Sequence, residues 1–225
     1  MSVRDYLGYH KFQVKNWIQQ LYRINKYRLQ GTIIQSGVRI ADNVTLYKSN
    51  QIGRNVIIAE NVIINPCVKI GNFSTLSNIQ IGKNSHVESR VECLGSGNGT
   101  IIIGCESYIG FSNILDWSDN ITIGDFVHIA GPSTGLWTHT SALKCLYSIP
   151  LNDNNLKYRP TAPIIIESNV YIGGNCTIYP GVKIGHHSIV APNSAVTKNV
   201  EPYTMVGGVP AVKIKSILLN EKRRE

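Results

Sequence analysis

Between Ile166 and Glu201 the chain repeats one six-residue unit, which reads IESNVY, IGGNCT, IYPGVK, IGHHSI, VAPNSA and VTKNVE. Each unit opens with an aliphatic residue, and its fifth residue is small or branched, as at Cys176 and Val182. The period of a helix would not bury the first position of every unit. A coil with three flat faces does bury it, with the fifth position packed beside the first. The repeat therefore predicts a parallel β-helix.

The same unit occurs earlier in the chain, interrupted by turn-rich text such as Gly95–Thr100, which predicts loops at a corner of the coil. Glycine at the second position suggests a corner that needs positive φ or a close backbone approach. We expect one domain at residues 31–213, stabilised by contacts between successive coils. The earlier units open at Ile40, Ile52, Ile58, Ile64, Ile70, Ile81, Ile103, Ile109 and Ile123.

The excess positive charge lies at the two ends of the chain. The net charge is +8 for the whole sequence; residues 1–30 contribute +5 and residues 213–225 contribute +3, so the solenoid between them is neutral. We expect residues 1–30 to form a basic helical cap, with an amphipathic helix from about Lys11 to Arg23. Residues 214–225 are expected to form a short C-terminal helix or a frayed tail. The helical spacing is carried by Val14, Trp17, Ile18, Leu21, Tyr22 and Ile24.

Two interpretations of the basic helix remain open. It could shield the first coil of the solenoid, or it could rest on an anionic membrane surface as a peripheral contact. Nucleic-acid binding is not expected, because the chain has no recognised motif and no basic stripe on the solenoid. No apolar run approaches the length of a membrane span, and the N-terminus has no secretory h-region. A cytoplasmic location is therefore expected.

The longest break in the repeat follows Ala130, and we expect residues 141–163 to project from the coil as an arm. His139 lies at the root of this arm, next to Trp137 and between two threonines. An imidazole can take and return a proton near neutral pH, so His139 is the candidate catalytic base. No third histidine is spaced to complete a zinc site with His128 and His139, and the five cysteines show no CxxC spacing. No metal is expected.

With these features in place, the chain resembles the hexapeptide-repeat acyltransferases of the galactoside/maltose O-acetyltransferase type, which are widely used on bacterial polysaccharides. The resemblance covers about residues 100–215. It is most specific at ITIGDFVHIAG (121–131), WTH (137–139), residues 163–185 and the block IVAPNSAVTKNVEPYTMVGGVPAVKI (189–214). It implies a left-handed β-helix that assembles as a homotrimer, with active sites between subunits.

The resemblance also implies roles for individual residues. His139 would deprotonate the acceptor hydroxyl, whose oxygen then attacks the thioester of acetyl-CoA directly, and the backbone N–H of Gly174 would stabilise the oxyanion. The acceptor sugar is expected near Trp137 and a set of polar residues before the histidine, Asn113, Asp116 and Asp119. The cosubstrate contacts would fall on Tyr171, Gly173, Gly174, Ala191, Thr197 and Lys198.

Two positions depart from the family pattern. Relatives often have a serine where Gly174 stands, which leaves only the backbone donor here. They also often have an arginine where this chain has Val212, so Lys213 or Lys215 would have to bind the nucleotide phosphate, as point charges without bidentate geometry.

The sequence thus predicts an enzyme that moves acetyl from acetyl-CoA to a sugar hydroxyl of a surface polysaccharide or its precursor. One alternative is an acetyltransferase that acts on an amino-sugar nitrogen or an antibiotic. The other, from a different class, is a non-catalytic β-helix scaffold that displays flat faces for binding. Stabilisation by acetyl-CoA would distinguish the enzymes from the scaffold, because a ligand of the folded state raises the melting temperature.

Overall fold

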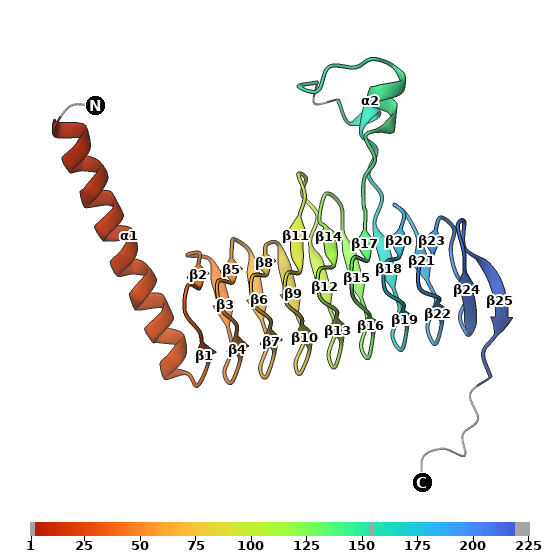
Figure 1. Ribbon diagram of the computed structural model, residues 1–225, viewed down its shortest axis with the longest axis horizontal. Helices are drawn as coiled ribbons and strands as arrows, with labels where there is room; N and C mark the ends of the chain where they lie inside the picture. The colour runs from red at the N-terminus through yellow and green to blue at the C-terminus, as the bar shows by residue number, and fades with distance from the viewer. Residues whose placement is uncertain (1–2, 154, 219–225) are drawn as a thin grey trace, which may run out of the picture.

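The computed structural model describes residues 3–153 and 155–218, with side chains from residue 16 onward. The chain winds into a left-handed parallel β-helix whose three walls are sheets of ten, eight and seven strands (Figure 1). The predicted fold class is confirmed.

The strands are two to five residues long, and each wall takes one strand from each successive coil. The ten-stranded sheet contains β1 (Ile33–Ile34), β4 (Gln51–Ile52), β7 (Lys69–Ile70), β10 (His86–Val87), β13 (Tyr108–Ile109), β16 (His128–Ile129), β19 (Tyr171–Ile172), β22 (Ile189–Val190), β24 (Thr204–Gly207) and β25 (Val212–Ser216). The eight-stranded sheet contains β2 (Arg39–Ile40), β5 (Ile57–Ile58), β8 (Thr75–Leu76), β11 (Glu92–Leu94), β14 (Ile114–Asp116), β17 (Gly135–Leu136), β20 (Thr177–Ile178) and β23 (Ala195–Val196). The seven-stranded sheet contains β3 (Val44–Leu46), β6 (Val62–Ile64), β9 (Ile79–Ile81), β12 (Ile101–Ile103), β15 (Ile121–Ile123), β18 (Ile164–Ile166) and β21 (Lys183–Ile184).

The core consists of the first and fifth positions of the repeat, as predicted. Ile172, Ile178 and Ile184 open three successive units and are 0% exposed, while Cys176 and Val182 at fifth positions are 1% and 2% exposed. In-register pairing, such as that between β15 and β18, stacks aliphatic residues of one coil directly on those of the next. The hydrophobic effect therefore stabilises the solenoid along its whole length.

The corners explain the glycines at second positions, but only in part. A Cβ on Gly110 would lie 2.2 Å from the backbone nitrogen of Gly131 in the next coil, so the expected close approach is present. Positive φ falls instead on the fourth position, for example at Asn175 (57°), because asparagine tolerates the left-handed region. We name the turns by the walls they join. The first corner follows the ten-stranded sheet (as at 173–176), the second follows the eight-stranded sheet (as at 179–182), and the third follows the seven-stranded sheet (as at 185–188).

The N-terminal helix α1 runs from Val3 to Leu29, so it is longer than the predicted segment from Lys11 to Arg23. It ends where Gly31 takes a left-handed conformation (φ 82°). The Gly31 N–H donates to the carbonyl of Arg28 at 3.0 Å, a common way to close the last helical turn. No helix of the described residues is long and apolar enough to cross a membrane.

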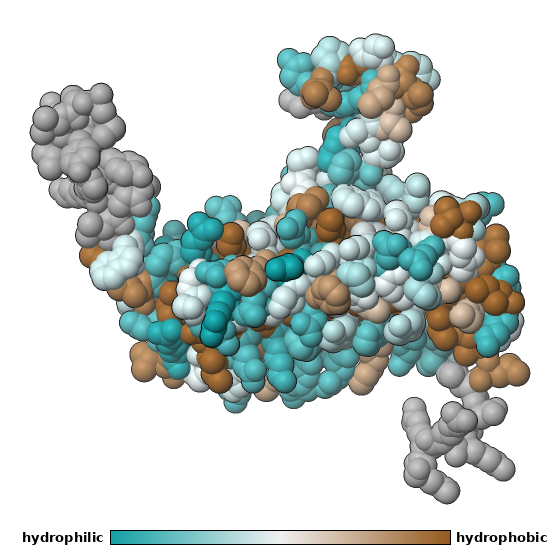
Figure 2. All heavy atoms as spheres, viewed as in Figure 1, coloured by the Kyte–Doolittle hydropathy of each residue, from teal (hydrophilic) through white to brown (hydrophobic). Residues whose placement is uncertain are grey.

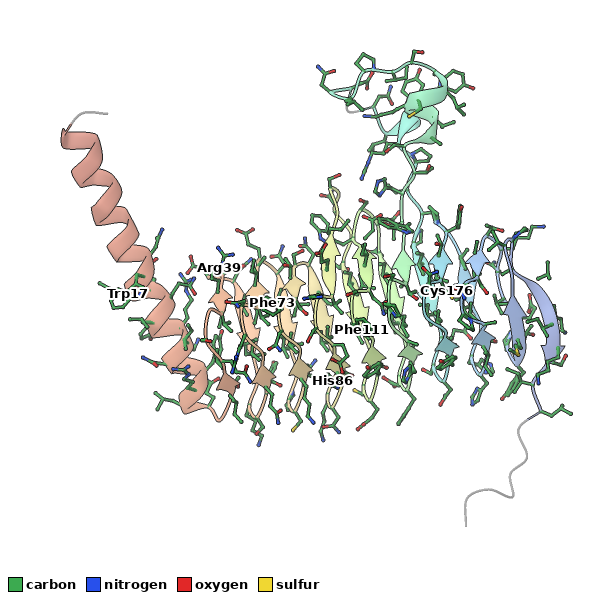
Figure 3. The ribbon with its side chains drawn as sticks, viewed as in Figure 1. Trp17, Arg39, Phe73, His86, Phe111 and Cys176 are labelled. Atoms are coloured by element: carbon green, nitrogen blue, oxygen red, sulfur yellow. The ribbon has the colours of Figure 1, made fainter. Side chains whose placement is uncertain are left out.

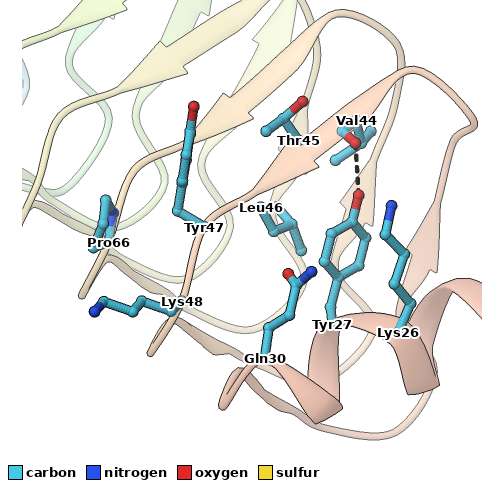
Figure 4. Close-up of a pocket in the computed structure, with 9 residues that line it drawn as sticks. All are labelled: Lys26, Tyr27, Gln30, Val44, Thr45, Leu46, Tyr47, Lys48 and Pro66. Carbon is cyan, nitrogen blue, oxygen red and sulfur yellow. Dashed lines mark hydrogen bonds between the residues drawn. The ribbon is translucent and has the colours of Figure 1, made fainter.

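The C-terminal half of α1 is attached to the first coils by polar side chains. The Gln20 amide exchanges two hydrogen bonds with the backbone of Ile40, at 2.8 and 3.0 Å. The Tyr27 hydroxyl donates to the carbonyl of Val44 at 2.6 Å, beside a surface hollow between α1 and the coils (Figure 4). These contacts position α1 over the first coil.

The apolar stripe predicted for this helix does not pack on the first coil. Trp17 (Figure 3), Ile18 and Tyr22 are 64%, 55% and 72% exposed. Among the stripe residues whose side chains are described, only Ile24 packs against the core cluster. Val14 lies outside the residues whose side chains are described. The difference arises because the attachment uses a neighbouring side of the helix, which carries Gln20 and Tyr27 and shares only Ile24 with the apolar stripe.

At the other end, the expected C-terminal helix is absent from the described residues up to 218. Val212–Ser216 instead forms β25, which pairs antiparallel with β24. Without β25, the strand β24 in the last coil would have an unpaired edge. Pairing with β25 satisfies the backbone N–H and C=O groups of that edge. Apolar side chains gather at this end of the solenoid (Figure 2), where Val209 is 77% exposed. Residues 219–225 lie outside the described part of the chain.

The expected arm is present as a projection from the second corner (Figure 1). It contains the short helix α2 (Ala142–Leu146) and the 3-10 helix η1 (Leu156–Tyr158). Lys144 is 8% exposed, and its ammonium group donates to the carbonyls of Leu151 (3.3 Å) and Asp153 (2.6 Å). These bonds give the arm an internal structure of its own.

Candidate active site

Three departures from the six-residue repeat lie at the second corner, in consecutive coils. They are the loop 95–100 after β11, the turn 117–120 after β14, and the segment 137–163 after β17, which contains the arm. The loops touch one another: a Cβ on Gly97 would lie 2.2 Å from the carbonyl oxygen of Ser118. The second corner therefore provides a continuous non-repetitive surface next to the arm.

His139 lies at the root of the arm, where the two legs of the arm pair with each other. His139 and Thr161 form an antiparallel bridge. On either side, the N–H of Thr140 donates to the carbonyl of Pro160 and that of Ala162 to the carbonyl of Thr138. The backbone of His139 is thereby held on both sides, while its side chain remains 22% exposed.

The imidazole of His139 is paired with a buried carboxylate. Its Nδ1 lies 2.6 Å from Oδ2 of Asp116, the last residue of β14, and Asp116 is 0% exposed. Burial of Asp116 opposes its ionisation, but hydrogen bonds from Ser118 and His139 outweigh burial and hold the pKa of the carboxyl below its ordinary value. Asp116 is therefore ionised at neutral pH.

An ionised carboxylate can only accept hydrogen bonds, so Nδ1 of His139 must carry the proton in this pair. In the neutral ring Nε2 is then the basic atom, and no group of the described residues bonds to it. The Thr138 N–H also donates to Asp116 Oδ2, at 2.9 Å. The arrangement orients the imidazole and prepares Nε2 to accept a proton from a ligand.

The candidate acceptor residues are placed differently from the expectation. Asn113 is 0% exposed and bonds the backbone of Thr134 and Ala130, so it holds the first corner and cannot face a ligand. Asp116 is equally buried and serves His139 instead. Asp119 and Trp137 are partly exposed at the second corner, and the N–H of Asp119 donates to Thr138 Oγ1 at 2.9 Å. These two remain candidates for acceptor contact.

Gly174 lies at the first corner, and its backbone N–H has no acceptor among the described residues. A Cβ on Gly174 would lie 2.5 Å from the carbonyl oxygen of Gly131 in the preceding coil. A Cβ on Gly173 would lie 2.5 Å from the nitrogen of Pro192 in the following coil. The corner is therefore tightly packed on both sides, and it presents one free N–H donor.

The candidate cosubstrate residues are divided between two corners. Gly173, Gly174 and Ala191 lie at the first corner, whereas Thr197 and Lys198 are exposed at the second corner, along the same edge as His139. Tyr171 lies on the outer face of the ten-stranded sheet, with its ring 5.4 Å from that of His128. Lys213 and Lys215 are exposed on β25. Within one chain these residues do not lie together.

Two residues of this site were missed in the sequence. Ser118 donates from its hydroxyl to Asp116 Oδ1 at 2.7 Å, and Arg159 of the arm donates to the Ser118 hydroxyl at 2.9 Å. The text Asp116-Trp117-Ser118 is a local signal for such a turn. No feature of the sequence indicated that Arg159 of the arm contacts Ser118.

The cysteines take no part in this arrangement. Cys93 and Cys176 are buried, the latter in the core as predicted (Figure 3), and burial raises the pKa of Cys93 to about 12. In the described residues no three His, Cys, Asp or Glu side chains are grouped so that they could hold a metal ion.

Comparisons with known proteins agree with this fold. The family described as "Bacterial transferase hexapeptide (six repeats)" matches residues 163–198. A chloramphenicol acetyltransferase of Klebsiella aerogenes is 29% identical over 64% of this chain and 70% of its own length. The galactoside O-acetyltransferase of Escherichia coli (strain K12) is 35% identical over 61% of this chain and 63% of its own, so less than two thirds of that enzyme is spanned. The crystal structure of the polySia-specific acetyltransferase NeuO matches with 27% identity and a TM-score of 0.52, covering 87% of this chain and 90% of that one.

The repeat, the β-helix and these relatives agree on the class: the chain has the hexapeptide-repeat β-helix fold and is similar to the acetyltransferases built on it. Among these it is similar to the galactoside O-acetyltransferase type.

Proposed function

We propose that this protein transfers an acetyl group from acetyl-CoA to a hydroxyl of a sugar in a glycan, with His139 as the general base. The observation that carries the proposal is the Asp116–His139 pair at the root of the arm, which leaves a basic Nε2 on a partly exposed ring. A general base must lie within hydrogen-bond reach of the proton it removes, and the second corner offers a surface on which an acceptor could bind.

His139 Nε2 would take the proton of the acceptor hydroxyl as that oxygen forms a bond to the acetyl carbonyl carbon. The free N–H of Gly174 would donate to the developing oxyanion, a contribution of about 3 kcal/mol in the transition state. When the carbon–sulfur bond breaks, the imidazolium of His139 would return the proton to the departing thiolate. Asp116, ionised throughout, stabilises the imidazolium between these two steps.

The division of the candidate residues supports a shared site. His139 and Lys198 lie at the second corner and Gly174 and Ala191 at the first, so the two sets meet if the second corner of one subunit faces the first corner of another. Rotational assembly of three chains would form three such clefts. We therefore propose a homotrimer in which acetyl-CoA lies between subunits. Lys213 and Lys215 offer exposed cations for its phosphates.

A glycan acceptor is supported by the likeness to the galactoside O-acetyltransferase and to the polySia-specific acetyltransferase NeuO. A second candidate acceptor is a small antibiotic hydroxyl, which the likeness to chloramphenicol acetyltransferase favours. Both acceptors fit the same chemistry at His139.

The exposed side of α1 supports a peripheral membrane contact. Trp17, Ile18 and Tyr22 are uncovered, and residues 1–30 carry a net charge of +5. Apolar side chains and basic charge on one helix favour an anionic membrane surface. We propose that α1 both caps the first coil, through Gln20 and Tyr27, and rests on such a surface.

An acetyl-CoA consumption assay with a panel of acceptors tests the proposed reaction. The panel would contain galactosides, nucleotide sugars, polysialic acid, an amino sugar and chloramphenicol. Turnover with a glycan, and loss of turnover in His139→Ala, is the expected result. If chloramphenicol is the only member of the panel that is acetylated, the acceptor is an antibiotic and not a glycan. If no acceptor is used and acetyl-CoA does not raise the melting temperature, the protein is a scaffold.

A further inference from the structure

Arg159 links the arm to the loops of the second corner. Its Nη2 donates to the Ser118 hydroxyl at 2.9 Å, and its Nη1 donates to the carbonyl of Ser96 at 3.2 Å. One guanidinium therefore bridges these three departures from the repeat: the loop 95–100, the turn 117–120 and the arm.

The bond from Arg159 fixes the direction of the next hydrogen bond. A guanidinium has no acceptor, so the Ser118 oxygen must accept from Arg159, and it also accepts from the N–H of Ser96 at 3.3 Å. Its own proton then goes to Asp116 Oδ1 at 2.7 Å. Hydrogen bonds therefore converge on Asp116 from two sides: from Arg159 through Ser118 onto Oδ1, and from Nδ1 of His139 onto Oδ2.

The charges of these groups complement one another. An imidazole must be neutral before it can act as a general base. Next to a neutral imidazole Asp116 is a buried anion, which is costly without compensation. In the described part of the chain no lysine or arginine pairs directly with Asp116. Arg159 supplies a positive charge one hydroxyl group away. The charged groups of the elements around His139 are Asp116 of β14, Asp119 of the turn 117–120, and Lys144, Asp153, Lys157 and Arg159 of the arm. Of these described groups, only Asp116 bonds to the imidazole.

We propose that Arg159 is a positioning residue that, through Ser118 and Asp116, couples docking of the arm to the protonation state of His139. This inference rests on the proposed function of His139 as general base. With Arg159 in place, the charge of the carboxylate is compensated through Ser118. Without it, the uncompensated anion favours the imidazolium, which cannot accept a proton.

The test is the pH dependence of kcat in Arg159→Gln, measured with saturating acetyl-CoA and whichever acceptor the panel identifies. Loss of the positive charge makes protonation of His139 easier, so the acid limb of the profile should move to higher pH. At neutral pH kcat should fall about tenfold, the lower range for losing a charged hydrogen bond. Arg159→Lys, which keeps the charge, should restore the position of the limb.

The matched control is Lys157→Gln, which removes the same charge from the same arm. Lys157 lies over the ring of Tyr158 (5.6 Å) and takes no part in the hydrogen bonds that reach Asp116, so its variant should keep the parental profile. If Arg159→Gln lowers kcat equally at every pH, Arg159 only docks the arm and the proposal is wrong. If His139→Ala is fully active, the proposed base fails instead, which separates the two claims.

Discussion

His139 and Gly174 lie at opposite edges of the same wall: His139 follows β17 at the second corner, whereas Gly174 precedes β20 at the first. The eight-stranded sheet separates them within one chain. If both act on one acetyl group, they must come from two subunits.

Mixed assemblies test this arrangement. His139→Ala and Gly174→Ala should each be inactive alone, but chains refolded or expressed together should regain activity, because a site could combine the intact Gly174 of one variant with the intact His139 of the other. The parent should show a mass of about 75 kDa by light scattering, three times the 24.9 kDa chain. A mass near 24.9 kDa, or no recovery in a mixed assembly of the expected mass, would contradict the shared site.

Two glycine variants distinguish loss of the oxyanion donor from general damage to a corner of the solenoid. In Gly174→Ala the new Cβ would lie 2.5 Å from a backbone oxygen, and in Gly185→Ala it would lie 2.5 Å from the nitrogen of Pro202. Both variants should lose a similar, small amount of thermal stability, because both displace a neighbouring coil. Only Gly174→Ala should lose kcat, by about 10²–10³-fold for a displaced donor. Equal activity of the two variants would remove Gly174 from the mechanism.

Asp116→Asn tests the orientation of the imidazole. The amide can donate to Nδ1, which would favour the tautomer with its proton on Nε2, and kcat should fall by about 10²–10⁴-fold. Because the hydrogen bonds hold the pKa of Asp116 below its ordinary value, the carboxyl stays ionised as pH falls toward 5. The acid limb of the parental profile should therefore not report protonation of Asp116. Thermal unfolding measured alongside would show whether the variant is still folded.

Much of the fold follows from the sequence, because each first-position residue repeats the same environment in every coil. The repeat thus predicted burial at Ile172 and Cys176 without knowledge of distant contacts. Of the Asp116–His139 pair and its partners, the sequence indicated the role of His139 alone. Its position beside a break in the repeat can be recognised from the neighbouring residues. Arg159 and Ser118 meet only after the arm folds back, and Asp116 looked like an acceptor ligand because a sequence does not show which polar side chains are buried.

The exposed side of α1 predicts binding to anionic vesicles. Trp17→Ser combined with Tyr22→Ser should reduce co-sedimentation with vesicles that contain phosphatidylserine, while binding to neutral vesicles should be weak for every variant. Binding of the parent should also weaken at high salt, because the basic charges are screened. Tyr47→Ser removes a half-exposed aromatic ring from the solenoid and should have no effect. Equal sedimentation of the double variant and the parent would leave α1 as a cap alone.

Transfer of labelled acetyl from acetyl-CoA to the acceptor by the parent and by His139→Ala tests the central claim most directly. The parent should form an acetyl ester on a sugar hydroxyl, and His139→Ala should lose about 10²–10⁴-fold in kcat while it keeps its melting temperature and its stabilisation by acetyl-CoA. His128→Ala, on the outer face of β16, should stay within a few fold of the parent. Retention of most of the activity in His139→Ala, or loss of activity in His128→Ala instead, would contradict the account.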